Sequence, residues 1–196
     1  MEHKVKCLLW DFGDTLCDEK FIWSSGPEWM NAYRSFDDGG IGAAWNLGEL
    51  DTRGFAAELS KQMKLSADTI RSHMIERCRH IVFFSGTWAF FKARHLPQAI
   101  VTVNPDLFSE VIVPVCGLDG MCDTIVTSWQ EQTADKNILN RLAIERMNLS
   151  CENHEALLID NKSLNIDRWV SVGGQGYRYT DDAAFERNFA AGLESK

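Results

Sequence analysis

The chain has 196 residues, of which 45% are hydrophobic and 24% charged, and its formal net charge is −8. This length is enough for one well-buried core with a small appended subdomain. The acidic balance argues against a nucleic-acid surface, which needs a basic stripe, and against an anionic membrane surface, so we expect a small-molecule substrate with no nucleic acid and no membrane as partner.

The first predicted element is a buried strand over residues 5–12. Its hydrophobicity is continuous rather than alternating, which is typical of a parallel strand covered on both faces. Residues 17–84 follow and contain helical patterns with no clear strand among them. The first helix is predicted over 27–36, with Pro27 in its first turn.

Two further helices are predicted within the same segment. Asp51 precedes one helical pattern and Ser66 precedes another over 67–82, and both residue types are preferred as helix N-caps. Because this helical segment directly follows the first strand, we expect it to lie above the carboxyl end of that strand, where a lid would lie.

The remaining chain alternates between strand and helix. Helices are predicted over 106–113 and 135–147, and short apolar runs that predict buried strands lie at 98–103, 124–127 and 156–160. On the 135–147 helix the expected apolar face consists of Ile138, Leu142 and Met147. This alternation predicts an α/β fold with a doubly wound, Rossmann-like parallel sheet. Right-handed crossovers place the carboxyl ends of all its strands along one edge, where ligands bind.

The predicted domain division has an α/β core of residues 1–16 and 85–196 and a helical cap of residues 17–84. No apolar stretch approaches the ~20 residues that span a bilayer. The apolar run near the first residue is too short for a signal peptide and ends in an acid, so we expect a cytoplasmic protein. The six cysteines form no CxxC pair and favour reduced thiols.

Acids stand at the carboxyl ends of two predicted strands. Asp11 follows Leu8, Leu9 and Trp10, and Asp160 follows a similar apolar run. Two carboxylates on one dry edge repel each other unless a cation lies between them. Oxygen ligands with few protein donors suit Mg²⁺, and Asn161 could support the metal or its waters.

Other polar residues occupy the neighbouring strand ends. Lys136 begins the helix after the third strand, and its ammonium group could neutralise both Asp11 and a phosphate. Asn104 follows the second strand, close to Thr102. Together with the two acids, these groups predict a site for a phosphorylated ligand.

The ordered set Asp11, Asn104, Lys136 and Asp160 resembles the four motifs of the haloacid dehalogenase-like (HAD) hydrolase superfamily. The resemblance runs from "WDFGDTL" through "IVTVN" and "DTIVTSWQEQTADK" to "LLIDNKSLNIDRWVSVGGQGYRY". The 17–84 segment resembles the small helical cap that follows the first motif in one subgroup. The resemblance implies a hydrolase on a Rossmann-like core and says little about the substrate, because this fold hosts many activities.

The resemblance also implies roles for individual residues. Asp11 matches the nucleophile that forms a covalent aspartyl intermediate. Lys136 matches the lysine that holds the nucleophile and the phosphoryl charge together, and Thr102 and Asn104 match the phosphate-binding motif. The implied ligands of Mg²⁺ are Asp11, the carbonyl of Gly13, Asp160 and Asn161. Asn165 falls where a polar residue often supports the metal shell.

Two departures from the family pattern affect the chemistry. Phosphatases of the family usually carry a second aspartate two residues after the nucleophile, which protonates the leaving oxygen. Gly13 stands there, and the nearest acid is Asp14, which either takes the catalytic role or satisfies turn amides. Val103 precedes Asn104 where Ser or Thr is usual, and Thr102 lies one place earlier, on the other face of a regular strand unless a bulge intervenes.

Three functions therefore remain open. The first is an Mg²⁺-dependent phosphatase that acts on a small phosphorylated metabolite through an aspartyl-phosphate. The second is a 2-haloacid dehalogenase, which needs neither metal nor leaving-group protonation but needs a halide cradle, with Arg34, Trp45 and Asn46 as candidates. The third is a catalytically impaired HAD-fold binding protein, which Gly13 and Val103 favour and the retained acids and lysine oppose.

Overall fold

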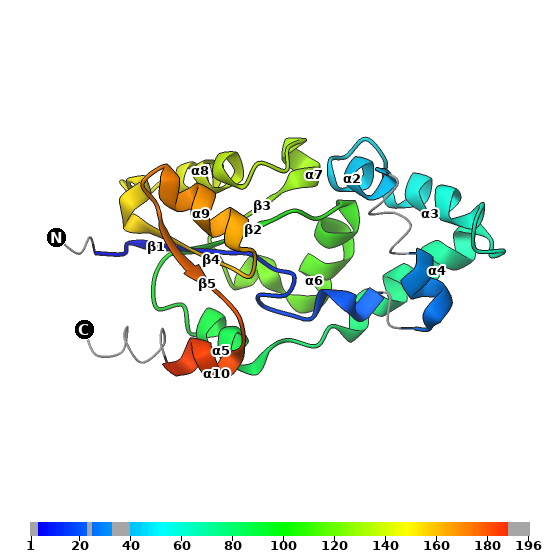
Figure 1. The fold of residues 1–196 in the computed structure, drawn as a ribbon, viewed down its shortest axis with the longest axis horizontal. Coiled ribbons are helices and arrows are strands. Elements are labelled where there is room, and N and C mark those ends of the chain that lie inside the picture. The colour runs from blue at the N-terminus through cyan, green and yellow to red at the C-terminus, as the bar shows by residue number, and fades with distance from the viewer. Residues whose placement is uncertain (1–3, 23–24, 33–39, 188–196) are drawn as a thin grey trace.

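The computed structural model describes residues 4–22, 25–32 and 40–187. Its centre is one five-stranded parallel sheet with the order β3-β2-β1-β4-β5. The strands are β1 (Cys7–Trp10), β2 (Gln98–Thr102), β3 (Thr124–Thr127), β4 (Ala156–Asp160) and β5 (Gln175–Arg178). Helices cover both faces of the sheet (Figure 1), which confirms the predicted doubly wound α/β fold.

Four of the five strands lie where the sequence predicts them. Trp10 at the end of β1 is paired with Ile100 of β2 and with Ile159 of β4, so β1 is central and fully buried. The fifth strand, β5, is not among the predicted elements, because its sequence QGYR contains a glycine and no apolar run. It is an edge strand whose residues alternate between half-buried and exposed, and its backbone pairs with β4.

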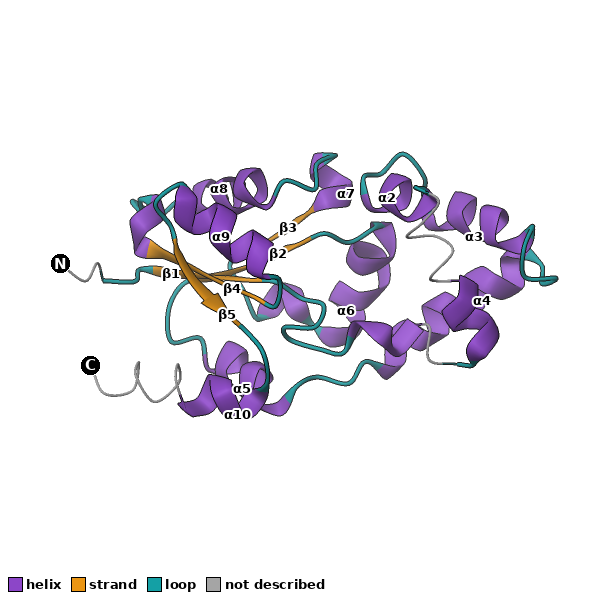
Figure 2. Cartoon of the chain, in the orientation of Figure 1, coloured by secondary structure: helices purple, strands orange, loops and turns teal. Residues whose placement is uncertain are grey.

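Two layers of helices enclose the sheet (Figure 2). Their bounds are α5 (Ser85–Ala93), α6 (Val113–Cys116), α7 (Ser128–Glu131), α8 (Lys136–Arg146), α9 (Ser163–Ser171) and α10 (Asp182–Phe185), with short helical turns at η3 (Phe108–Ile112), η4 (Leu118–Gly120) and η5 (Asn153–Glu155). In Figure 1, α8 and α9 lie on one face, and α5 and α10 lie together on the other. The predicted 106–113 helix is present but continues to Cys116, with a π-helical stretch at η3.

Helices also fill the segment between β1 and α5. They are η1 (Glu19–Ile22), α2 (Ile41–Asn46), α3 (Thr52–Ser60), α4 (Ala67–Arg77) and η2 (Cys78–His80). Both predicted caps are present: the Asp51 carboxylate accepts from Gly54 N at 2.7 Å, and the Ser66 hydroxyl accepts from Thr69 N at 3.1 Å. The predicted 27–36 helix is described only to residue 32, over which it is helical.

The helices α2, α3 and α4 lie beyond the carboxyl ends of the strands, at the right of Figure 1. One cluster of buried side chains runs from the sheet into these helices, and it joins Trp10 and Phe108 to Phe55 and Ile70. The helical segment therefore packs directly on the sheet layer. Its separation as a cap domain of residues 17–84 stays a prediction.

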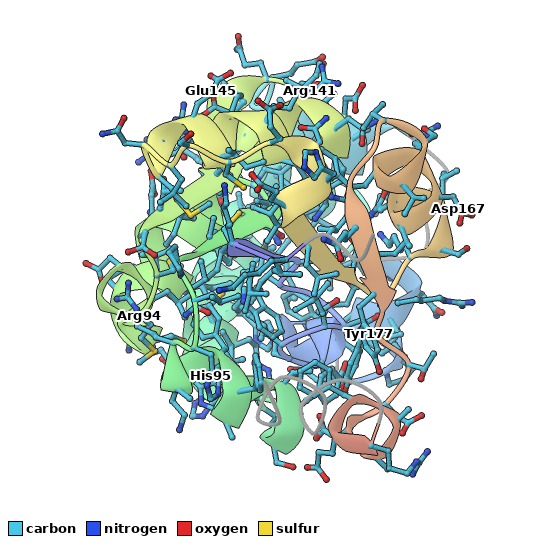
Figure 3. The ribbon with its side chains drawn as sticks, turned by 90° about the vertical axis from the view of Figure 1, so that its left-hand side faces the viewer. Arg94, His95, Arg141, Glu145, Asp167 and Tyr177 are labelled. Atoms are coloured by element: carbon cyan, nitrogen blue, oxygen red, sulfur yellow. The ribbon has the colours of Figure 1, made fainter. Side chains whose placement is uncertain are left out.

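The buried face of α8 agrees with the predicted one only in part, since Leu142 and Met147 are half-buried against the sheet cluster and Ile138 is not. Ile138 is 47% exposed, whereas Leu139 and Ala143 are fully buried against the sheet. Arg141 and Glu145 project from the outer side of α8 (Figure 3). The reason lies in Lys136, which points inward and thereby fixes the rotation of the helix: residues three and seven positions later share its face.

Two expectations about the whole chain concern thiols and membranes. All six cysteines are free, as predicted, and the sulfurs of Cys7 and Cys151 lie 3.6 Å apart. Among the residues that the structure describes, no helix has the length and apolar character needed to cross a bilayer.

Candidate active site

The site lies at the carboxyl edge of the sheet, between β1 and β4. The chain builds β1, β2 and β3 in one direction and then returns to place β4 and β5 on the other side of β1. In open α/β sheets such a reversal leaves a crevice at the carboxyl ends of the two central strands. Asp11 directly follows β1 and Asp160 ends β4, so both predicted acids lie at this crevice.

Lys136 joins the two acids. Its Nζ donates to Asp11 Oδ1 at 2.6 Å and lies 3.3 Å from Asp160 Oδ2. A third contact, to the carbonyl oxygen of Val101 at 2.5 Å, fixes the ammonium from the β2 side. Lys136 is the first residue of α8, which begins at the Asp135 cap, and is only 4% exposed.

The pKa of Asp11 depends on its burial and on the neighbouring charges. Burial raises the pKa of Asp11, the Lys136 ammonium lowers it, and the neighbouring Asp160 carboxylate raises it again, with the net direction upward. Within the buried cluster two carboxyl groups share one ammonium, and the exposed Lys162 also lowers the pKa of Asp11. A further cation at the site would stabilise both carboxylates.

Asp160 is held rigidly by its own loop. Its Oδ1 accepts from Lys162 N at 2.8 Å, and its Oδ2 accepts from Asn165 Nδ2 at 2.9 Å. The family resemblance implies that Asn165 supports the metal shell, and its side chain does contact Asp160. Asp160 is fully buried, so these bonds also offset the cost of removing its carboxylate from water.

Thr15 contributes a contact that sequence reasoning missed. Its hydroxyl lies 3.5 Å from Asp11 Oδ2 and accepts from Asn161 N at 3.1 Å. Thr15 is fully buried and so ties the loop after β1 to the loop after β4. The residue follows Asp11 by four positions, which the sequence shows, but its link to Asn161 depends on the packing of two distant loops.

Asn161 supplies an oxygen without a partner. Its Oδ1 is buried and accepts no hydrogen bond among the described residues. A buried acceptor of this kind is normally satisfied by a donor, a water or an ion. The described residues contain no group of three His, Cys, Asp or Glu side chains that could hold a metal, so a cation here would rely on carbonyl and amide oxygens beside Asp11 and Asp160.

Thr102 and Asn104 form a separate pair. Asn104 Nδ2 donates to Thr102 Oγ1 at 2.6 Å, and Thr102 is only 1% exposed. Strand alternation puts Thr102 on the face of Ile100, opposite to Val101. No hydrogen bond recorded for the described residues joins this pair to the Asp11–Lys136 cluster, and its role in phosphate binding stays a prediction.

Asp14 occupies a tight turn after the nucleophile position. Its φ is 52°, and its Oδ1 accepts from Glu19 N at 3.2 Å. This is a turn-amide contact of the kind that the sequence offers as the alternative to a catalytic role for Asp14. Asp14 and Asn161 also line a cavity of about 630 Å³ that extends towards Arg178. Asp14 therefore lies at this cavity, and its catalytic role stays a prediction.

Of the proposed halide-cradle residues, Trp45 has its side-chain donor engaged elsewhere, and the role of the Asn46 side chain stays a prediction. Trp45 Nε1 donates to Asp106 Oδ1 at 2.9 Å inside the protein, so its donor is already used. The backbone oxygen of Asn46 accepts from the Ser128 hydroxyl at 2.6 Å. Arg34 lies outside the described residues.

No protein-family model and no curated protein matches the sequence. Solved structures match over nearly the whole chain. A HAD family enzyme from Bacteroides thetaiotaomicron, crystallised with magnesium and inorganic phosphate, is 14% identical with a TM-score of 0.71, covering 94% of this chain and 99% of its own. The L-2-haloacid dehalogenase of Xanthobacter autotrophicus is 13% identical with a TM-score of 0.67, covering 96% and 83%.

A third similar structure is described as a predicted HAD-like family hydrolase from Porphyromonas gingivalis. It is 11% identical with a TM-score of 0.70, covering 98% of this chain and 99% of its own. The chain therefore has the fold of the haloacid dehalogenase-like hydrolases.

Proposed function

We propose that this chain is an Mg²⁺-dependent phosphatase of small phosphorylated metabolites that works through an aspartyl-phosphate at Asp11. The observation that carries the proposal is the buried Asp11–Lys136–Asp160 cluster, in which two carboxyl groups share one ammonium. The net charge of −8 supports a small-molecule substrate rather than nucleic acid or an anionic membrane.

Asp11 is suited to act as the nucleophile. Its Oδ1 is held by Lys136, while the only hydrogen bond recorded for Oδ2 among the described residues is the long one from Thr15. Oδ2 attacks phosphorus, and the bond to the leaving oxygen breaks with its electron pair. Water then attacks the phosphorus of the aspartyl-phosphate and returns the carboxylate.

Lys136 supplies the positive charge that this reaction needs. Its ammonium is fixed by three oxygens, including the Val101 carbonyl, so it does not have to reorganise as the phosphoryl group arrives. A preorganised charge in a dry site is worth more than the same charge in water.

The residues at this site fit Mg²⁺. The carboxylates of Asp11 and Asp160, the carbonyl of Gly13 and the unpartnered Oδ1 of Asn161 would hold the ion. When bound, Mg²⁺ would neutralise charge on the transferred group and polarise its oxygens. The similar Bacteroides thetaiotaomicron enzyme was crystallised with magnesium and phosphate, which supports this choice of cofactor.

A 2-haloacid dehalogenase is the second candidate. The similarity to the Xanthobacter autotrophicus dehalogenase and the glycine at position 13 both favour it, since halide leaves without a proton. Against it, the donor of Trp45 is engaged with Asp106 rather than presented to a ligand.

Phosphate release from p-nitrophenyl phosphate and acetyl phosphate, with Mg²⁺ and with EDTA, tests the proposal. We expect release that requires Mg²⁺ and that falls by roughly 10⁴-fold or more in Asp11→Asn, because the nucleophile is lost. The matched control is Asp119→Asn, an exposed aspartate remote from the site in sequence.

Other outcomes identify the alternatives. Halide release from 2-haloacids in EDTA, without phosphate release, would establish the dehalogenase. A folded protein that is silent on every substrate would favour the binding protein.

A further inference from the structure

The proposed phosphatase lacks an acid at the position where the sequence leads us to expect one. A poor leaving group such as an alkoxide needs a proton as its bond to phosphorus breaks. Gly13 has no side chain to give one, so another group must act near it. The inference below rests on the proposed function and names that group.

The loop after Asp11 folds back on itself. Asp14 N donates to Cys17 O at 2.7 Å, and residues Gly13 and Cys17 form an isolated bridge. The left-handed turn at Asp14 closes this loop, and its carboxylate then receives Glu19 N. Glu19, the first residue of η1, is thereby brought back beside Gly13.

The side chain of Glu19 takes the room that a side chain at position 13 would need. A Cβ placed on Gly13 would lie 2.7 Å from Glu19 Oε2 and 3.1 Å from Glu19 Cβ. The φ of Gly13 is not among the positive values that favour glycine. A side chain at position 13 would therefore meet Glu19 rather than a backbone constraint, and the Glu19 carboxylate would have to move.

This carboxylate lies beside Gly13, which follows Asp11 by two residues. Asp11 N still pairs with Ile159 O at 2.9 Å, as an extension of β1, and Phe12 turns the other way into the large hydrophobic cluster. The buried Cys17 thiol has its pKa raised first by burial and also by the charges of Asp11, Asp14 and Glu19, all of which belong to this part of the chain.

We propose that Glu19 is the catalytic acid and base of the reaction and replaces the aspartate that Gly13 lacks. Gly13 leaves the usual position of the acid without a carboxyl group, and Glu19, six residues later, supplies one in its place. The carboxyl group reaches the usual place from a different point on the chain.

The proton transfers balance over the two steps. In the first step, Asp11 attacks phosphorus and the Glu19 carboxyl O–H gives its proton to the leaving oxygen, which departs as an alcohol. In the second step, the Glu19 carboxylate takes a proton from the attacking water while the Asp11–phosphorus bond breaks. Inorganic phosphate leaves, and Asp11 and Glu19 return to their starting states.

The test compares two leaving groups. We expect Glu19→Gln to lower kcat/KM for β-glycerophosphate by roughly 10²–10⁴-fold. For p-nitrophenyl phosphate the loss should be much smaller, since that group leaves without a proton. Glu145→Gln is the matched control, because it makes the same change at an exposed residue on the outer side of α8 and should leave both rates near the wild-type values.

Moving the carboxylate gives a second, independent test. In Gly13→Asp/Glu19→Ala, the new aspartate enters the room that Glu19 vacates, and we expect it to restore much of the β-glycerophosphate activity. In Gly13→Ala, the added Cβ displaces the Glu19 carboxylate, and we expect the same leaving-group-dependent loss as in Glu19→Gln. Thermal unfolding of each variant confirms that it is folded.

Equal losses on both substrates, or no loss, in Glu19→Gln would overturn the assignment. A leaving-group-dependent loss in Asp14→Asn, with Glu19→Gln unaffected, would transfer the role to Asp14. If the wild-type chain hydrolyses p-nitrophenyl phosphate but not β-glycerophosphate, Glu19 does not work as a donor although the phosphatase stands. If it releases phosphate from neither substrate, both the phosphatase proposal and the role of Glu19 fail.

Discussion

Lys136 and Asp11 form an ion pair of 2.6 Å with side chains that are 3% and 10% exposed. Lys61 and Glu58 form a pair of the same length at the surface, where their side chains are 66% and 36% exposed. Water screens the surface pair and supplies alternatives to it, but it does neither for the buried pair. The same distance therefore has very different consequences at the two places.

We predict that Lys136→Met destabilises the protein by about 3–5 kcal/mol, because Asp11 and Asp160 then face each other without their shared cation. Urea denaturation measures this change, and Lys61→Met is the control, with a far smaller expected effect. Added Mg²⁺ should recover part of the loss, since it supplies positive charge to the same carboxylates. Equal effects of the two substitutions would contradict the account.

For single residues, the sequence predicts the functional groups that lie at strand ends. It misses the groups whose position depends on how distant loops pack together. The convergence of Asp11 and Asp160 could be predicted, because parallel strands have their carboxyl ends at one edge of the sheet. The role of Thr15 between two loops, and the approach of Glu19 to Gly13, depend on how the loop after β1 folds back. No local pattern in the sequence encodes that path.

At the scale of elements, the loop after β2 is tied to the helices that follow η1. Asp106 is buried, and its carboxylate accepts from Trp45 Nε1 at 2.9 Å, from Thr52 N at 2.7 Å and from Thr52 Oγ1 at 2.6 Å. These bonds satisfy the first residue of α3 and fix it to the loop that also carries Asn104. The link joins the predicted cap to the predicted core.

Asp106→Ala should therefore lower the free energy of unfolding by about 3 kcal/mol, because three buried donors lose their acceptor. Chemical denaturation checks the magnitude, with Asp119→Ala as an exposed control. A loss no larger than that of the control would mean that the cap helices dock without this carboxylate.

A second carboxylate fastens α5 to the start of α10. Burial would raise the pKa of Asp182, but hydrogen bonds from the backbone of Gly86 and Thr87 and from Ser85 and Tyr179 outweigh it and lower the pKa. A carboxyl whose folded pKa lies below its unfolded value of about 3.9 adds stability above that value. This stability is lost as the pH falls through the folded pKa.

Asp182→Asn is thus expected to lower the unfolding temperature at neutral pH. As the pH falls below about 4 the difference from the wild type should shrink, because the wild-type carboxyl is then protonated as well. Thermal unfolding followed by circular dichroism across this range measures both curves. A difference that stays constant with pH would show that the charge of Asp182 does not contribute.

Helix faces illustrate how function overrides an apolar pattern. The spacing of Ile138, Leu142 and Met147 predicted the inner face of α8, yet Ile138 is exposed. Lys136 must reach Asp11, and this requirement turns the helix. A lysine is normally counted as a surface residue, so the hydrophobic pattern alone misplaces Ile138, although Leu142 and Met147 do pack against the core.

For the whole molecule, the strand order places the ends of β1 and β4 side by side, and with them Asp11 and Asp160. Sequence alternation was enough to predict the doubly wound sheet and four of its strands, because continuous apolar runs are typical of buried parallel strands. It was not enough for β5, whose sequence contains a glycine and no apolar run and whose place at the edge leaves it half exposed. The predicted acids are carried by β1 and β4, so this omission did not affect them, although Arg178 of β5 lines the cavity beside Asn161.

The central claim, that Asp11 carries a phosphoryl group during turnover, is tested most directly by trapping that intermediate. The protein is mixed with radiolabelled acetyl phosphate and Mg²⁺, quenched in acid and digested, and the label is located by peptide mass spectrometry. We predict label on the peptide that contains Asp11, and none in Asp11→Asn or in EDTA. Continued phosphate release by Asp11→Asn at the wild-type rate, or label on another residue, would contradict the account.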